Sequence, residues 1–339
     1  MKMLALRLAI LAALLLVMPS CKHKPLCEFH PHQAKVKVVF DWRNAPTANP
    51  KGMCVFFYPE DGGTPRRYDF KGMEGGYVDL SVGRYRVIAY NNDTEYVDFA
   101  YTDAYERHLI FSPTNDIFSP LGLTSSGYIP RADDTERVVS RPDMMWACSA
   151  VEVDVKENGI TYIHNEVSRA TEVNNSATVE RIITLYPHQI VATYTLNVKN
   201  CDGLEYVTQM CGSLSGMAPN ITVSSEALGA ECVTVPYECR KKDETTIEAV
   251  FLTFGHNTDN TQPHRVVLYL WMTDNKIRCY GIDSEKFDVT SQVHSAPDRL
   301  NVYLEIDGLD LPKPISGGSG FIPDVDDWID VETDLDMSN

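Results

Sequence analysis

The sequence predicts an all-β protein, and three observations carry this prediction. Short apolar or alternating segments recur along most of the 339 residues, and turns rich in Gly and Asn separate them. No long segment shows the 3.6-residue periodicity of an amphipathic helix. Hydrophobic residues make up 44% of the chain, which is enough for sizeable cores in two ordinary domains. We therefore expect two β-sandwich domains in tandem.

The first 20 residues are typical of an export signal. Two basic residues precede an apolar run over residues 8–18, which is too short to cross a bilayer as a helix. The run ends at Pro19-Ser20-Cys21, which resembles the lipobox of bacterial lipoproteins, although Met18 and Pro19 replace its commoner residues. In that family the signal is cut before the cysteine and the thiol is acylated, so the resemblance implies a lipid on Cys21. Ordinary secretion with an unmodified Cys21 is the alternative.

The chain is acidic, with a formal net charge of -17, and removal of the signal makes the mature body more negative still. An acidic surface repels nucleic acid and anionic lipid. We therefore expect no nucleic-acid partner and interpret the charge as a solvated surface.

The first half reads as a tether followed by short strands. Residues 21–34 are polar and contain two prolines, as expected for a tether. Residues 35–42 begin with strict alternation, which predicts a half-buried strand. The denser apolar run over residues 54–58 predicts a strand that is covered on both faces. Further short strands are expected at residues 77–80, 84–90, 96–100 and 108–111.

A region without strand rhythm follows. Four prolines interrupt residues 112–146. The run Asp133-Asp134-Thr135-Glu136-Arg137 is expected to be solvated charge. We place the domain junction near residue 140, which gives an N-terminal domain over residues 35–140 and a C-terminal domain over residues 141–312.

The second half repeats the β pattern. The alternation is clearest over residues 148–155 and 190–199. Residues 205–210 are ambiguous, and the residues 211–216, Cys-Gly-Ser-Leu-Ser-Gly, are expected to form a loop. Further strands are expected at residues 180–186, 231–237, 246–254, 265–272, 276–282 and 300–306.

The tail, residues 313–339, begins with a Gly/Ser hinge and continues as an acidic segment that carries large apolar residues. Such residues are unusual in a disordered end, so we predict an edge strand that pairs with a groove, in cis or in trans, by β-augmentation. A packed or frayed tail of its own domain is the alternative. The candidate residues are Phe321, Ile322, Val325, Trp328, Ile329 and Val331.

There are nine cysteines, and eight remain when Cys21 is set aside for lipid. An even number in an exported protein permits disulfides. Cys201 with Cys211, and Cys232 with Cys239, are close enough in sequence to be candidate pairs. Buried free thiols are the alternative, because Cys packs well in cores.

The sequence offers no catalytic constellation. It contains no His-Glu-x-x-His zinc motif and no Gly-rich phosphate loop. Cys27, His30 and His32 lie close together, but a structural metal site needs four fixed ligands, so a chance cluster is the better interpretation. We therefore expect no enzyme activity, no cofactor and no metal site.

Several segments together resemble a known family. They are the lipobox at Cys21, the first strand over residues 36–42, Val55-Phe56-Phe57-Tyr58-Pro59, the segment 82–95 (VGRYRVIAYNNDTE), Leu214-Ser215-Gly216-Met217 and residues 320–328. They are similar to Bacteroidales lipoproteins related to the fimbrillins, in a branch that carries a domain of unknown function among fimbrial anchor and subunit proteins. The resemblance implies two tandem transthyretin-like β-sandwich domains, a lipid anchor in the outer membrane, and assembly with other fimbrial subunits.

The same resemblance suggests a processing site. In polymerising fimbrillins a protease cuts after an arginine near the first strand, and a neighbouring subunit fills the groove that this leaves. Arg43 follows the first predicted strand and is the candidate for such a cut. An ordinary loop arginine is the alternative, and an uncut chain would keep its lipid as an anchor or terminal subunit.

The leading hypothesis is a lipid-anchored, surface-exposed fimbrial subunit or anchor that assembles by strand addition. The rival hypothesis is a surface glycan-binding lipoprotein. It would need solvent-facing Trp and Tyr side chains clustered on one rim.

Overall fold

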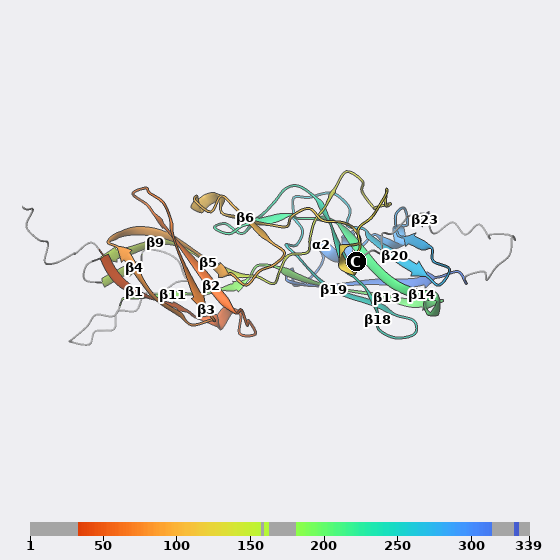
Figure 1. Ribbon diagram of the computed structural model, residues 1–339, viewed down its shortest axis with the longest axis horizontal. Coiled ribbons are helices and arrows are strands. Elements are labelled where there is room, and N and C mark those ends of the chain that lie inside the picture. Colours follow the sequence, from red (N-terminus) through yellow and green to blue (C-terminus); the bar gives the residue numbers. More distant parts are fainter. Residues whose placement is uncertain (1–32, 157–158, 163–180, 314–328, 332–339) are drawn as a thin grey trace, which may run out of the picture.

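Nearly all regular structure in the computed structural model is β-strand, as Figure 1 shows. The structure describes residues 33–156, 159–162, 181–313 and 329–331. Within these residues the only α-helix is α2 (Thr290–His294), so the all-β prediction is confirmed. Short 3-10 helices occur at η1 (Trp42–Asn44), η2 (Tyr105–Arg107), η3 (Ser119–Leu121), η4 (Leu204–Tyr206) and η5 (Glu285–Phe287).

Two sheets form a first strand group, which lies toward one end of the molecule (Figure 1). Their facing side chains enclose one apolar cluster. The smaller sheet has the order β11 (Ile182–Leu185), β1 (Gln33–Phe40), β4 (Gly75–Ser81). The larger has the order β10 (Gly159–Tyr162), β9 (Trp146–Lys156), β5 (Gly83–Asn91), β2 (Gly52–Pro59), β3 (Arg66–Lys71), and β12 (His188–Gln189) pairs with β9.

The burial of β1 and β2 follows their sequence patterns. In β1 the even-numbered residues from 34 to 40 are buried, and Lys35 between them is exposed. In β2 every residue from Gly52 to Tyr58 is buried, because Phe57 enters the cluster of the first group while Phe56 enters a different cluster on the other face. Both sequence predictions are confirmed.

Two further sheets form a second strand group at the other end of the molecule (Figure 1). They enclose the largest apolar cluster of the described residues. One sheet has the order β18 (Arg240–Lys241), β19 (Ile247–Thr253), β13 (Ala192–Asp202), β22 (Asn301–Asp310). The other has the order β23 (Ile329–Val331), β21 (Ile277–Tyr280), β20 (Val266–Met272), β14 (Val207–Met217), β17 (Val233–Glu238), β8 (Arg137–Val138).

A small bridging sheet lies between the two groups. Its order is β16 (Ala227–Leu228), β15 (Asn220–Thr222), β7 (Leu109–Phe111), β6 (Asp98–Ala100). The apolar cluster beneath it joins Phe56 of β2 and Tyr90 of β5 to Ile221 of β15 and Phe254. Side chains from the two groups therefore share one core at their junction.

The chain passes between the groups more than once. β8 pairs with β17 of the second group, and the chain then returns, because β9 pairs with β5 and β11 with β1. The last strand that pairs within the first group ends at Gln189, and the next strand, which pairs within the second group, begins at Ala192. The sequence analysis placed the domain junction near residue 140. Local alternation cannot reveal this, because pairing partners are set by contacts between distant segments.

The expected loop at residues 211–216 is wrong, because these residues form the middle of β14. β14 is a central strand with β17 on one side and β20 on the other. Its Gly212 marks a close approach, since a Cβ there would lie 2.6 Å from the Tyr237 ring. Glycine in this strand reflects packing and not a turn.

Candidate functional site

Arg43, the candidate processing site, lies in η1 directly after β1. Asp41 accepts hydrogen bonds from the Arg43 backbone N–H at 3.1 Å and from its Nε at 3.0 Å. The Arg43 guanidinium lowers the pKa of the Asp41 carboxyl and also lies over the Tyr186 ring, 4.8 Å from its centroid. The side chain is 66% exposed. A protease can therefore reach this arginine, but it must unwind the turn to engage the backbone.

A cut after Arg43 would release β1, which is bonded along both edges. β1 pairs with β11 in parallel and with β4 antiparallel. Its buried residues Val36, Val38 and Phe40 are part of the core of the first group. Removing the strand would expose that core and two strand edges at once.

The tail contributes one short strand to its own chain. Ile329–Val331 forms β23, antiparallel to β21, with Ile329 opposite Cys279 and Val331 opposite Ile277. β23 is the edge strand of its sheet. The remaining candidates of the predicted tail strand (Phe321, Ile322, Val325, Trp328) lie outside the described residues, and so does Cys21.

No disulfide joins the described cysteines, so neither candidate pair, Cys201 with Cys211 or Cys232 with Cys239, is bonded. Cys201 packs in the core of the second group, while Cys211 points to the opposite face of its sheet. Cys239 also packs in that core, whereas Cys232 lies at the wall of a surface cavity. Burial raises the pKa of Cys201 to about 11, so it remains a thiol at neutral pH.

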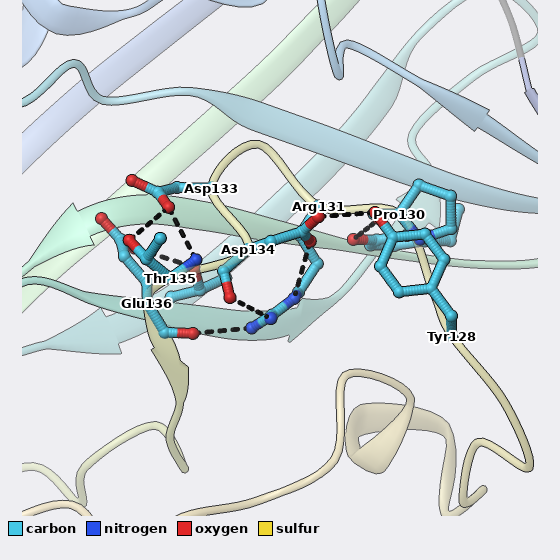
Figure 2. Close-up of polar contacts among 9 residues, drawn as sticks. Tyr128, Pro130, Arg131, Asp133, Asp134, Thr135 and Glu136 are labelled. Atoms are coloured by element: carbon cyan, nitrogen blue, oxygen red, sulfur yellow. Dashed lines mark hydrogen bonds and ion pairs between the residues drawn. The ribbon is translucent and has the colours of Figure 1, made fainter.

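Residues 117–136, called here the strap, cover the outer face of the sheet that contains β14 and β20. Phe118 and Ile129 of the strap pack against Tyr269 in a separate apolar cluster, and the Tyr269 hydroxyl donates to the Pro130 carbonyl at 2.9 Å. Figure 2 shows how the end of the strap is fixed: Arg131 donates to the backbone carbonyls of Asp134 and Glu136 at 3.0 and 2.7 Å.

The charge run at the end of the strap is not solvated throughout. Glu136 is only 7% exposed. Its carboxylate accepts the Gly216 N–H at 3.0 Å and the Thr234 hydroxyl at 2.8 Å, and burial is the main cause that raises its pKa. The prediction of solvated charge is therefore wrong for Glu136, which fastens the strap to β14 and β17. No local pattern distinguishes this glutamate from its exposed neighbours.

A cavity of about 470 Å³ opens beside Glu136. Its lining is mostly acidic or amide-bearing and includes Asp133, Glu231, Cys232, Asn257 and Asp259. The Glu136 carboxylate already has its hydrogen-bond partners, so it contributes a wall to this cavity and not a free acid.

Three histidines, two from the loop between β19 and β20 and one from the end of α2, meet on the other side of Gly216. The ring centroids of His256, His264 and His294 lie 5.0 to 5.5 Å apart. His264 Nδ1 lies 3.2 Å from the Ser215 carbonyl oxygen, and its Nε2 lies 3.2 Å from Nε2 of His294. Burial lowers the pKa of His264 and lowers that of His256 to about 4. The sequence analysis did not identify these residues, because no motif spacing links them.

Another buried histidine lies at the junction of the two groups. His108 is fully buried between the hydroxyls of Tyr58 and Tyr90. The Tyr58 hydroxyl donates to the Thr102 carbonyl at 3.1 Å, so it accepts from His108 Nδ1, and His108 Nε2 accepts from Tyr90. Burial lowers the pKa of His108 to about 4, which matches this neutral arrangement.

Within the described residues, the aromatic side chains do not form the rim that a glycan-binding site would need. No tryptophan among the described residues is exposed. The exposed tyrosines lie on separate elements, such as Tyr77 on β4 of the first group and Tyr303 on β22 of the second. No helix in the described part of the chain is long and apolar enough to cross a membrane.

Comparison with known proteins finds one family model and one named relative that each match most of this chain. A family model described as a domain of unknown function, DUF5119, matches residues 20–238. A Bacteroides ovatus protein with the provisional name fimbrium anchoring subunit Fim4B is 22% identical over 350 residues, which cover 94% of each chain.

Two solved structures are also similar. A Bacteroides ovatus protein provisionally called an adhesin has 20% identity and a TM-score of 0.56, covering 88% of this chain and 98% of the other. The fimbrial anchor protein Mfa2 of Porphyromonas gingivalis has 13% identity and a TM-score of 0.45, covering 89% and 96% of the two chains. The first of these shows that the fold is shared.

Proposed function

The chain belongs to the DUF5119 family, and on that premise we propose that it is a cell-surface fimbrial protein of the anchoring kind. One observation carries the proposal: the similarity to Fim4B covers 94% of both chains, so it extends over the whole architecture. The role is structural and adhesive, and it depends on surfaces and strand edges instead of a catalytic centre.

The two strand groups are proposed to be two transthyretin-like β-sandwich bodies. Each group has its own pair of sheets around its own apolar cluster, which supports this assignment. The junction near residue 140 is moved to the segment between Gln189 and Ala192, because β9 to β12 pair within the first group.

A lipid on Cys21 is proposed to hold the first group at the outer membrane. Gln33, the first residue of β1, follows Cys21 by 12 residues, so a tether of this length reaches roughly 40 Å at most. β1 and β23 lie toward opposite ends of the molecule (Figure 1). A chain anchored at Cys21 can therefore present its second group away from the membrane.

Strand addition is proposed as the means of assembly, and the edge of β21 supports this choice. Only three residues of β23 pair with this edge. So short a pairing offers few backbone hydrogen bonds, and a longer strand can compete for the same edge. The tail, with Phe321, Ile322, Val325 and Trp328 as its apolar residues, is the proposed donor to a partner subunit.

The anchor form is proposed over the polymerising form, because β1 is integral to the first group. A cut after Arg43 would remove both the lipid and a strand that is paired along both edges.

Mass spectrometry of the N-terminus of the protein taken from cell surfaces tests this proposal. We expect an acylated Cys21, and the Cys21→Ala variant should be lost from the membrane fraction. A mature chain that begins directly after Arg43 would overturn the anchor form and support a polymerising subunit.

A further inference from the structure

We propose that His256, His264 and His294 bind a divalent transition-metal ion such as Zn²⁺. The three rings form a compact triangle with sides of 5.0, 5.2 and 5.5 Å between centroids. His256 and His264 lie in the loop between β19 and β20, and His294 is the last residue of α2. Imidazole is a preferred ligand of Zn²⁺, Cu²⁺ and Ni²⁺.

The geometry of two of the rings already suits a shared ion. His264 Nε2 and His294 Nε2 lie 3.2 Å apart. Two nitrogens bound to one tetrahedral Zn²⁺ at their usual bond lengths lie roughly 3.3 Å apart. The separation of the two nitrogens therefore already matches that of two ligands of one ion. The hydrogen that His294 Nε2 donates to His264 would move to Nδ1 of His294 when the ion binds.

The third ring must turn to complete the set. In the part of the chain that the structure describes, no three side chains already converge as ligands on one point. The His256 ring is nearly parallel to His294, with an angle of 14° between their planes. His256 follows Gly255, which has a positive φ of 97°, in a loop between two strands. The proposed site therefore requires the His256 side chain to turn until a ring nitrogen faces the other two.

The surroundings of His264 are those of a metal-binding imidazole. A carbonyl oxygen can only accept, so the contact with Ser215 puts the His264 hydrogen on Nδ1 and leaves the Nε2 lone pair facing His294. Metal-bound histidines commonly donate their other ring N–H to a backbone carbonyl or a carboxylate, which fixes the tautomer.

The peptide group between Ser215 and Gly216 adds a carboxylate to this arrangement. Its N–H donates to both carboxylate oxygens of Glu136, at 3.0 and 3.1 Å, while its carbonyl accepts from His264. Hydrogen bonds in such a chain polarise one another. Glu136 therefore strengthens the bond that orients His264.

A bound ion would tie the end of α2 to the loop between β19 and β20.

Isothermal titration of the full chain tests the site, at pH 7.5, after chelator treatment and without an added histidine tag. We expect one equivalent of Zn²⁺ to bind and to raise the Tm, and Mg²⁺ to do neither. His294→Ala is the main variant, because His294 is exposed and its loss should leave the fold intact. We expect it, and also His256→Ala, to weaken Zn²⁺ binding by more than the roughly 10- to 100-fold that a lost outer-shell partner costs.

Two control variants separate this site from other histidines. His188→Ala removes a half-buried histidine of the first group, and His30→Ala with His32→Ala removes the pair in the tether; both should bind Zn²⁺ as the unaltered chain does. The proposal is overturned if the unaltered chain binds no Zn²⁺, or if binding survives His294→Ala and His256→Ala but is lost in the tether variant.

Discussion

The Arg43 side chain, just after the end of β1, contacts Tyr186, a residue far along the chain. The guanidinium lies 4.8 Å from the centroid of the Tyr186 ring, and Tyr186 directly follows β11, the parallel neighbour of β1. Arg43, the only candidate cleavage site of the sequence analysis, thus lies in a turn that is held by a contact with a distant residue.

This contact predicts slow cleavage at Arg43 in the folded protein. A cation–π contact at an exposed site contributes about 0.5–1 kcal/mol, so Tyr186→Ala should raise the rate of cleavage after Arg43 about two- to fivefold. Limited proteolysis with an arginine-specific protease, mapped by mass spectrometry, measures this rate. Tyr303→Ala, at an exposed tyrosine on β22 of the second group, should leave it unchanged. Equal rates in the unaltered chain and Tyr186→Ala would contradict the prediction.

Acid should destabilise the protein through its buried histidines. The pKa of His108 is about 4 in the folded chain, against 6.5 for an ordinary histidine. Below pH 6.5 the unfolded chain therefore binds more protons, and the free energy of unfolding falls as the pH drops from 6.5 to 4. His108 alone can account for a loss of about 3 kcal/mol. Denaturant unfolding at pH 7.5 and pH 4.5 measures the change.

Two variants test which histidines cause this pH dependence. His108→Asn should make the free energy of unfolding less dependent on pH. Some pH dependence should remain, because the pKa values of His256 and His264 are also lowered. His188→Asn should steepen it, because a hydrogen bond to Glu226 raises the pKa of His188, whose stabilising contribution is therefore present in acid and lost as the pH rises. An unchanged slope in His108→Asn would show that the junction histidine is not responsible.

Gly216 should tolerate no side chain. Its φ is +77°, and a Cβ would lie 2.6 Å from His264 Nδ1. Gly122 has a similar φ of +70° but open space around it, so Gly122→Ala isolates the backbone cost of about 1–2 kcal/mol. Gly216→Ala should lose at least about 1 kcal/mol more, because it also disturbs the bonds to His264 and Glu136. Denaturant unfolding of the two variants gives the difference directly, and equal losses would show that the contact with His264 is unimportant.

Deletion of residues 321–339 should leave a folded monomer that no longer assembles with partner subunits. The deletion removes β23, which pairs over only three residues, so the Tm should change little. Deletion of residues 332–339 alone keeps β23 and is the matched control. Co-purification with fimbrial subunits and size-exclusion chromatography measure the effect. Normal assembly of the longer deletion would mean that the tail is not the donor strand.

The sequence predicts the strands well, because each strand is a local pattern. Expected boundaries at residues 84–90, 148–155 and 265–272 differ from β5, β9 and β20 by one or two residues. β3 was missed, because it alternates weakly between exposed and half-buried positions. The segment of β14 around Gly212 was assigned to a loop, because its glycines look like turn residues, whereas Gly212 is required by the Tyr237 ring and Gly216 by its positive φ and the contact with His264.

Long-range relations could not be predicted in the same way. The pairing of β9 with β5, the contact of Glu136 with Thr234 and the contact of His264 with His294 all join segments far apart in sequence. Glu136 and Asp134 look alike in the sequence, yet one is buried and the other exposed. Only the packing of the strap on β14 and β17 distinguishes them.

The position of β1 also bears on mechanical load. If the chain is held by Cys21 and pulled at its far end, the force enters at the start of β1 and acts along the strand. The hydrogen bonds of β1 to β11 and β4 run across that direction. They must then shear together and cannot be peeled apart one by one. The strand next to the tether is therefore oriented to resist extension.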